Sequence, residues 1–128
     1  MMRKIYIVFA TLIVFSCNST EEKNITVLDT ASYSEAIEKG KTTLIDVRTP
    51  EEYAEGHLEN AVNVNYLSDD FAEKISDYKK RKPIYIYCRS GNRSGKAALV
   101  MDSLGFKKIL DLEGGVLGWQ AAGKPLVK

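Results

Sequence analysis

The chain has 128 residues, 45% of them hydrophobic and 27% charged, which is typical of one globular domain with a single core. Its 18 basic and 17 acidic residues nearly balance, so the composition gives no sign of a nucleic-acid-binding protein. The only two cysteines, Cys17 and Cys88, do not make the repeated pattern of a disulfide framework.

The first 24 residues have the pattern of an export signal followed by a tether. Two basic residues precede an apolar run over residues 5–15, which is too short to span a bilayer as a stable helix. The run ends at Cys17 in a sequence that resembles a bacterial lipoprotein signal. We therefore expect residues 1–16 to be a signal peptide, Cys17 to carry lipid and residues 17–24 to form a polar tether. Ordinary secretion, with Cys17 removed or free, is the alternative.

From residue 25 onward, short apolar runs alternate with segments of helical spacing. This alternation predicts an α/β domain with a parallel sheet over residues 25–128. The predicted strands lie at residues 25–28, 43–47, 61–64, 83–87 and 108–112. The predicted helices are one capped by Ser32 and stopped by Gly40, one from Pro50 to a stop at Gly56, one over residues 69–75 capped by Ser68, one over residues 96–104, and a last short helix that holds Trp119.

The stretch Cys88-Arg89-Ser90-Gly91-Asn92-Arg93-Ser94 lies between a buried strand and a helix, where ligands bind in parallel α/β sheets. Backbone N–H groups of a tight loop at a helix start form an anion cradle and favour a thiolate there. Arg89 and Arg93 add positive charge suited to an oxyanion. A buried structural cysteine before an ordinary turn is the alternative. The two arginines and the glycines at 91 and 95 favour a nucleophile.

A second motif runs from Asp46 to Leu58 at the end of another predicted strand. Thr49 has the position of an N-cap, with proline at the next position and Glu52 as its capping-box partner. Asn60 follows, and asparagine tolerates left-handed backbone angles in a turn.

A third motif closes the domain. Gly114 and Gly115 permit a tight turn between strand and helix, and Trp119 is expected to anchor the last helix in the core.

In their order and spacing, the three motifs resemble those of the rhodanese, or sulfurtransferase, family. The resemblance implies a five-stranded, mainly parallel sheet with helices on both faces. It also implies that Cys88 takes sulfane sulfur as a persulfide and passes it on, with no metal and no cofactor. The loop residues that it implies for substrate binding are Arg89, Ser90, Gly91, Asn92, Arg93 and Ser94. The residues that it implies as structural support of the site are Asp46, Arg48, His57, Gly114 and Gly115.

The expected partners are an anionic sulfur donor such as thiosulfate and a thiol or cyanide acceptor, with a thioredoxin-like protein as a further candidate. We expect a monomer in the bacterial cell envelope, held to the membrane by the lipid on Cys17. A non-enzymatic sulfur-carrier or regulatory domain is one alternative. A phosphatase or arsenate reductase is another, but only four residues separate Cys88 from Arg93. The related dual-specificity phosphatases have five, and the smaller loop fits sulfur better than a phosphoryl group.

Overall fold

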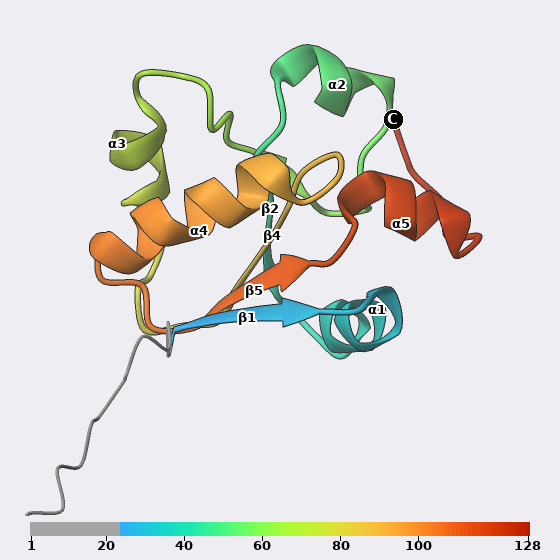
Figure 1. Cartoon of the computed structure of the whole chain (residues 1–128), viewed down its shortest axis with the longest axis horizontal. Helices are drawn as coiled ribbons and strands as arrows, with labels where there is room; N and C mark the ends of the chain where they lie inside the picture. The colour runs from blue at the N-terminus through green and yellow to red at the C-terminus, as the bar shows by residue number, and fades with distance from the viewer. Residues whose placement is uncertain (1–23) are drawn as a thin grey trace, which may run out of the picture.

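The computed structural model of this protein describes residues 24–128. The predicted signal peptide and Cys17 lie outside the described residues. Within them, strands and helices alternate along the whole chain (Figure 1). In order they are β1 (Ile25–Leu28), α1 (Thr30–Glu38), β2 (Thr43–Asp46), α2 (Pro50–Glu55), β3 (Val62–Asn63), α3 (Phe71–Ile75), β4 (Ile84–Tyr87), α4 (Asn92–Ser103), β5 (Ile109–Leu112) and α5 (Gly115–Ala121).

The five strands form one sheet in the order β1-β5-β4-β2-β3, and every pairing is parallel. This confirms the predicted α/β class and the five-stranded sheet. Strand β4 lies at the centre, which explains its continuous run of apolar and aromatic residues. Its neighbours place Asp46 opposite Tyr87 and Asp111 opposite Ile86, so the carboxyl ends of β2, β4 and β5 lie side by side.

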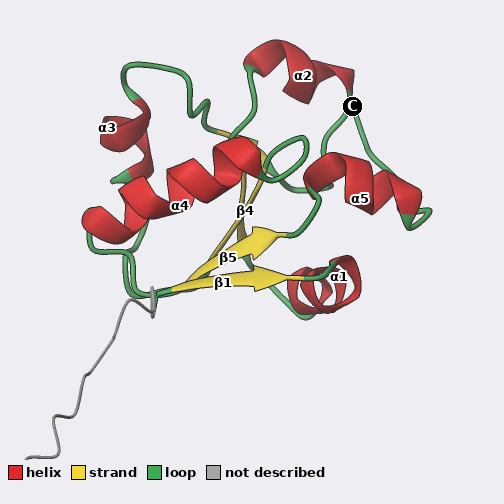
Figure 2. Ribbon diagram, viewed as in Figure 1, coloured by secondary structure: helices red, strands yellow, loops and turns green. Residues whose placement is uncertain are grey.

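Helices cover both faces of the sheet, as Figure 2 shows. Alternation along each strand sends successive side chains to opposite faces. In β4, Ile86 packs on the face covered by α3 and α4, and Tyr87 packs on the face covered by α1 and α5. The first core holds Ile45, Val47, Val64, Phe71, Ile75, Ile84, Ile86, Cys88, Ala97, Ala98, Met101, Phe106 and Ile109.

Three predicted helix starts were wrong. Helix α1 begins at Thr30, because Asp29 rather than Ser32 is the N-cap and accepts a hydrogen bond from the Ser32 amide at 2.8 Å. Helix α3 begins at Phe71, and the Ser68 hydroxyl bonds to the Asp70 side chain instead of capping the helix.

The third correction concerns the functional loop. Helix α4 begins at Asn92 and not at Lys96, because Gly91 takes a φ of 108° and turns the chain directly into the helix. The loop between Cys88 and the helix is therefore short, and Ser94 lies in the first helical turn.

The predicted start and end of α2 are confirmed. The Thr49 hydroxyl accepts a hydrogen bond from the Glu52 amide at 3.3 Å, the Glu52 side chain completes the capping box, and Gly56 ends the helix. Asn60 takes the expected left-handed angle, with a φ of 68°. Across residues 24–128, no helix combines the length and the apolar character needed to cross a bilayer.

Candidate active site

Cys88 follows β4 directly, at the carboxyl edge of the sheet, and only 1% of its surface is exposed. The Gly91 amide donates a hydrogen bond to its sulfur at 3.0 Å. The Ser94 hydroxyl oxygen lies 3.3 Å from the same sulfur. The predicted position of Cys88 between a strand end and a helix start is confirmed. A backbone donor aimed at Sγ favours negative charge on the sulfur.

The start of α5 holds the Cys88 loop in place. The Val116 amide donates to the Cys88 carbonyl at 2.9 Å, and the Leu117 amide donates to the Arg89 carbonyl at 3.0 Å. The close approach of the α5 start to the Cys88 loop requires a glycine at position 115, where φ is 54°. A Cβ atom there would collide with the Cys88 carbonyl oxygen and lie 2.6 Å from the Arg89 carbonyl carbon. The predicted tight turn at Gly114 and Gly115, between β5 and α5, is confirmed, and it lies against the backbone of Cys88 and Arg89.

Asp46 and Arg48 form a buried ion pair behind the loop. The Arg48 Nη2 atom lies 2.7 Å from Asp46 Oδ2 and also donates to the Gly56 carbonyl at 2.6 Å. The Tyr87 hydroxyl donates to Asp46 Oδ2 at 2.8 Å and accepts a hydrogen bond from the Leu58 amide at 3.1 Å. Burial raises the pKa of Tyr87, so the hydroxyl stays protonated and remains a donor. This network ties β2 and β4 to the segment after α2.

His57 makes contacts of a structural kind. Its Nδ1 atom lies 2.9 Å from the Tyr53 carbonyl oxygen, and its ring stacks on the Tyr53 ring at 3.7 Å between centroids. Its backbone pairs with that of Val127. All these partners lie on α2 and in the C-terminal segment.

The two loop arginines have different surroundings. Arg93 forms a bidentate ion pair with Glu52 of α2, at 2.6 and 2.9 Å. Arg89 is exposed and lines a cavity of about 260 Å³ beside the loop. That cavity is formed by Arg48, Glu52, Glu55, Gly56, Arg89, Val116, Leu117, Gln120 and Leu126. Ser90 and Asn92 are exposed on the same loop.

The structure adds residues that the sequence analysis did not assign to the site. Asn63 donates from Nδ2 to the backbone carbonyls of Asp46 and Arg48, at 3.0 and 2.9 Å. Tyr87 and Asp111 are buried polar groups on central strands. In the sequence, the signal that could have indicated these two residues is a hydroxyl and a carboxylate within predicted strands that are otherwise mostly apolar.

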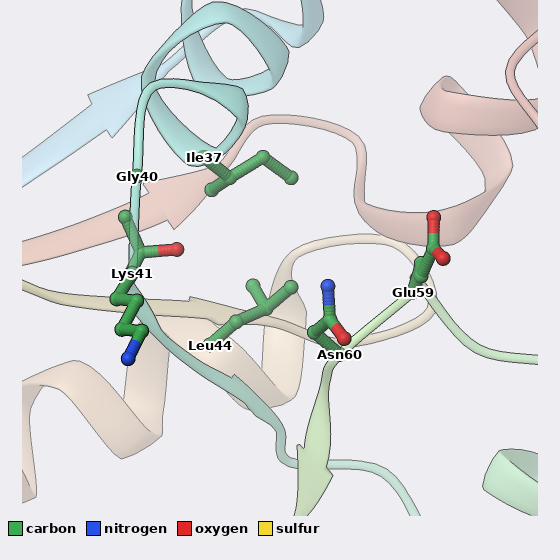
Figure 3. A pocket seen from close by; sticks show the side chains of 7 residues that line it. Ile37, Gly40, Lys41, Leu44, Glu59 and Asn60 are labelled. Atoms are coloured by element: carbon green, nitrogen blue, oxygen red, sulfur yellow. The ribbon is translucent and has the colours of Figure 1, made fainter.

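A second cavity, of about 300 Å³, lies between the C-terminal end of α1, strand β2 and the segment that joins α2 to β3 (Figure 3). It is lined by Ile37, Gly40, Lys41, Thr42, Leu44, Glu59 and Asn60. None of the candidate site residues lines it, so we assign it no part in the chemistry of Cys88.

Similarity to known proteins extends over most of the described chain. A sulfurtransferase of Allochromatium vinosum is 34% identical over 84 residues, which cover 66% of this chain and 77% of that protein. The chloroplastic thiosulfate sulfurtransferase 16 of Arabidopsis thaliana is 36% identical over 91 residues, covering 63% and 76%. The crystal structure of a rhodanese-related protein from Thermoplasma volcanium has a TM-score of 0.69 at 32% identity and covers 79% and 96%. Residues 29–122 match the family model of the rhodanese-like domain. The chain belongs to the rhodanese-like domain family.

Proposed function

We propose that this protein is a sulfurtransferase that carries sulfane sulfur on Cys88. The observation that carries the proposal is the Cys88 sulfur at the carboxyl end of β4, with the Gly91 amide donating to it at 3.0 Å. An amide in that position stabilises a thiolate, which is the nucleophilic form of cysteine. Relatives named sulfurtransferase support the same reaction class.

The proposed reaction has two half-reactions. In the first, the Cys88 thiolate attacks the outer sulfur of the donor, and the S–S bond of the donor breaks. With thiosulfate as donor, sulfite leaves with the bonding electron pair and Cys88 becomes a persulfide. In the second, a thiolate or cyanide attacks the outer sulfur of that persulfide, and the Cys88 thiolate leaves. The hydrogen bond from the Gly91 amide stabilises the Cys88 thiolate, both before it attacks the donor and after it leaves the persulfide.

Donor recognition is assigned mainly to Arg89. Arg89 is exposed and lines the cavity beside the loop, whereas Arg93 is already paired with the Glu52 carboxylate. A guanidinium suits the sulfonate end of thiosulfate, because it presents a planar set of donors. The predicted contact between Arg93 and substrate stays a prediction. Ser90 and Asn92, exposed on the loop, are further candidates for contact with the donor.

A steady-state assay tests the function. The purified protein is given thiosulfate with cyanide, a low-molecular-weight thiol or a thioredoxin-like protein, and sulfite release is measured over many turnovers. We expect continuous release with at least one acceptor and none above background with Cys88→Ser. If the protein takes up one sulfur atom but turns over with none of the acceptors, the result would favour the alternative of a sulfur-carrier domain. Release that is unchanged in Cys88→Ser would contradict the proposal.

We also propose that the mature protein is a monomer anchored in the bacterial cell envelope through lipid on Cys17. The support for the lipid anchor is the sequence of residues 1–24, with its basic start, short apolar run and polar tether. Fractionation of cells that express wild type or Cys17→Ala tests the anchor. We expect wild type in the membrane fraction and the variant in the soluble envelope fraction. Identical partition of the two proteins would exclude the anchor, and size-exclusion chromatography of the Cys17→Ala protein tests the monomer.

A further inference from the structure

The segments of the chain that enter the central strands carry an excess of basic residues. The sheet register places Ile109 of β5 opposite both Ile25 of β1 and Ile84 of β4, so these three strands begin at the same level. The segments before them therefore lie together at the amino edge of the sheet, and the Cys88 loop lies at the opposite, carboxyl edge (Figure 1). Six exposed residues in the segments before β4 and β5 form what we call the basic face: Lys79, Lys80, Arg81, Lys82, Lys107 and Lys108.

Backbone hydrogen bonds hold the two basic segments side by side. The Lys107 amide donates to the Lys80 carbonyl at 2.9 Å. The start of β1 lies next to them, because the Ile109 amide donates to the Asn24 carbonyl at 2.7 Å. The basic face is therefore one continuous area, although its residues come from two separate segments of the chain.

Most of the charge on the basic face has no acidic partner. No salt bridge between described residues includes any of its six side chains. Two acidic residues lie near it: Asp77 is exposed just before the first basic segment, and Asp102 in the last turn of α4 accepts a hydrogen bond from Asn24 Nδ2 at 2.7 Å. The whole chain has a net charge of only +1, so the positive charge is concentrated on this face.

The dipoles of the neighbouring helices do not account for this charge. Helices α3 and α4 end at the amino edge of the sheet, and the dipole of a helix favours basic residues at its C-terminal end. That effect falls off within the last helical turn. Helix α3 ends at Ile75 and α4 ends at Ser103, so all six basic residues lie beyond the last turns of the two helices.

We propose that the basic face binds the surface of an anionic bilayer, beside the point where the tether enters the domain. The tether over residues 17–24 leads into β1 at this same edge of the sheet. A protein held by lipid at this end has its amino edge close to the membrane, where lysine and arginine side chains are attracted to anionic headgroups. The inference rests on the proposed lipid anchor only for the choice of a bilayer over other polyanions.

Binding through the basic face sets the direction in which the candidate active site points. Cys88 follows β4 at the far edge of the sheet, about 13 Å from the level of Ile84, because four residues of extended chain separate the two. The Cys88 loop and the cavity lined by Arg89 then face away from the bilayer. Donors and acceptors in solution reach the site while the protein stays bound.

Vesicle flotation with the full-length Cys17→Ala protein tests the basic face without lipid on that residue. The vesicles contain phosphatidylcholine alone or equal parts of phosphatidylcholine and phosphatidylglycerol. We expect tighter binding to the anionic vesicles, with a difference that shrinks as salt rises to about 0.5 M. Lys80→Gln/Lys107→Gln should weaken binding to the anionic vesicles by about tenfold or more. Lys96→Gln/Lys128→Gln, which removes the same charge from exposed residues outside the face, should bind like the parent protein.

Three results would overturn the proposal. Equal weakening in the two double variants would show that net charge alone decides binding, because residues 1–23 are the same in all the proteins compared. Equal affinity for the neutral and the anionic vesicles would remove the role of the headgroup charge. Salt-sensitive binding to a double-stranded DNA oligonucleotide, without binding to the vesicles, would assign the face to nucleic acid.

The lipid anchor and the basic face are tested separately. Salt weakens attraction between charges but does not extract a lipid chain from a bilayer. When cells are fractionated at about 0.5 M salt, we therefore expect Cys17→Ala protein to be soluble and wild type to stay in the membrane fraction. Release of both proteins at that salt concentration would contradict the anchor, whereas the vesicle experiment, which uses no lipidated protein, decides the role of the basic face.

Discussion

Arg93 of the Cys88 loop and Glu52 of α2 are joined by two hydrogen bonds, at 2.6 and 2.9 Å. The hydrogen bond from Arg93 lowers the pKa of Glu52 to about 2, against the opposing effect of burial. The pair is therefore ionised at neutral pH. It connects two motifs that lie 41 residues apart in the chain, and Glu52 lines the cavity beside the Cys88 loop.

Replacing Glu52 should favour anionic donors. Glutamine keeps the capping box with Thr49 but removes the negative charge and releases Arg93. We expect Glu52→Gln to raise kcat/KM for thiosulfate by about three- to tenfold and to change kcat/KM for a neutral persulfide donor much less. Glu55→Gln is the matched control, because Glu55 lines the same cavity without that ion pair. Equal gains in the two variants would show that the release of Arg93 has no effect of its own.

Arg89 should contribute most to thiosulfate binding. A hydrogen bond to a charged group contributes about 1.5–3 kcal/mol, so Arg89→Gln should lower kcat/KM for thiosulfate by about ten- to a hundredfold. A neutral donor should lose less, and the exposed Arg81→Gln should change neither value. Steady-state kinetics with both donors measures this difference. The same loss with both donors would indicate that Arg89 shapes the loop and does not bind the anion.

Gly115 should tolerate no side chain. A Cβ atom would meet the Cys88 carbonyl and the Arg89 carbonyl group, and the backbone has a positive φ. We expect Gly115→Ala to lower the free energy of unfolding by about 2–4 kcal/mol and to abolish sulfur transfer. Gly40→Ala is the control, since open space surrounds that position. Urea denaturation of both variants measures the effect, and equal stability of the two would contradict the packing described for the loop.

The sequence predicted the site well where one local signal decided the structure. Thr49 and Glu52 form the expected capping box, Asn60 takes the expected left-handed angle, and the apolar run of β4 is the central strand. The predicted start of α4 was wrong because two glycines lie near the boundary between loop and helix. The sequence does not reveal which of Gly91 and Gly95 adopts a positive φ, and this depends on how the loop packs against α5.

Pairings between residues far apart in the sequence could not be predicted from the sequence, for a physical reason. Glu52 has a complete local role in its own helix, so nothing nearby in sequence indicates that it also binds Arg93. Likewise, Asp111 lies opposite Ile86, on the strand next to that of Cys88, only because β5 is inserted between β1 and β4. Strand order is set by packing of the whole domain, and a single sequence does not specify it.

Asp111 should lower stability at neutral pH. Its pKa rises from 3.8 in the unfolded chain to about 6 in the fold, mainly through burial. The folded state therefore binds more protons between these values, and the free energy of unfolding falls as pH rises from about 4 to 6. We expect Asp111→Asn to be more stable than wild type by about 1–3 kcal/mol at pH 7.5 and to lose this advantage below about pH 4.

Thermal or urea unfolding across this pH range provides the measurement. Asp77→Asn, which removes an exposed carboxylate, should follow the wild-type curve. A constant difference between Asp111→Asn and wild type from pH 4 to 7.5 would be inconsistent with a raised pKa at Asp111.

The most direct test of the central claim is the intact mass of the protein after a brief incubation with thiosulfate and no acceptor. Wild type should gain the mass of one sulfur atom, held on Cys88, and should lose it when cyanide is added. Cys88→Ser keeps Cys17 and should gain nothing, so it also controls for any sulfur loading at Cys17. Equal sulfur loading of Cys88→Ser and wild type would contradict the assignment of Cys88 as the sulfur-carrying nucleophile.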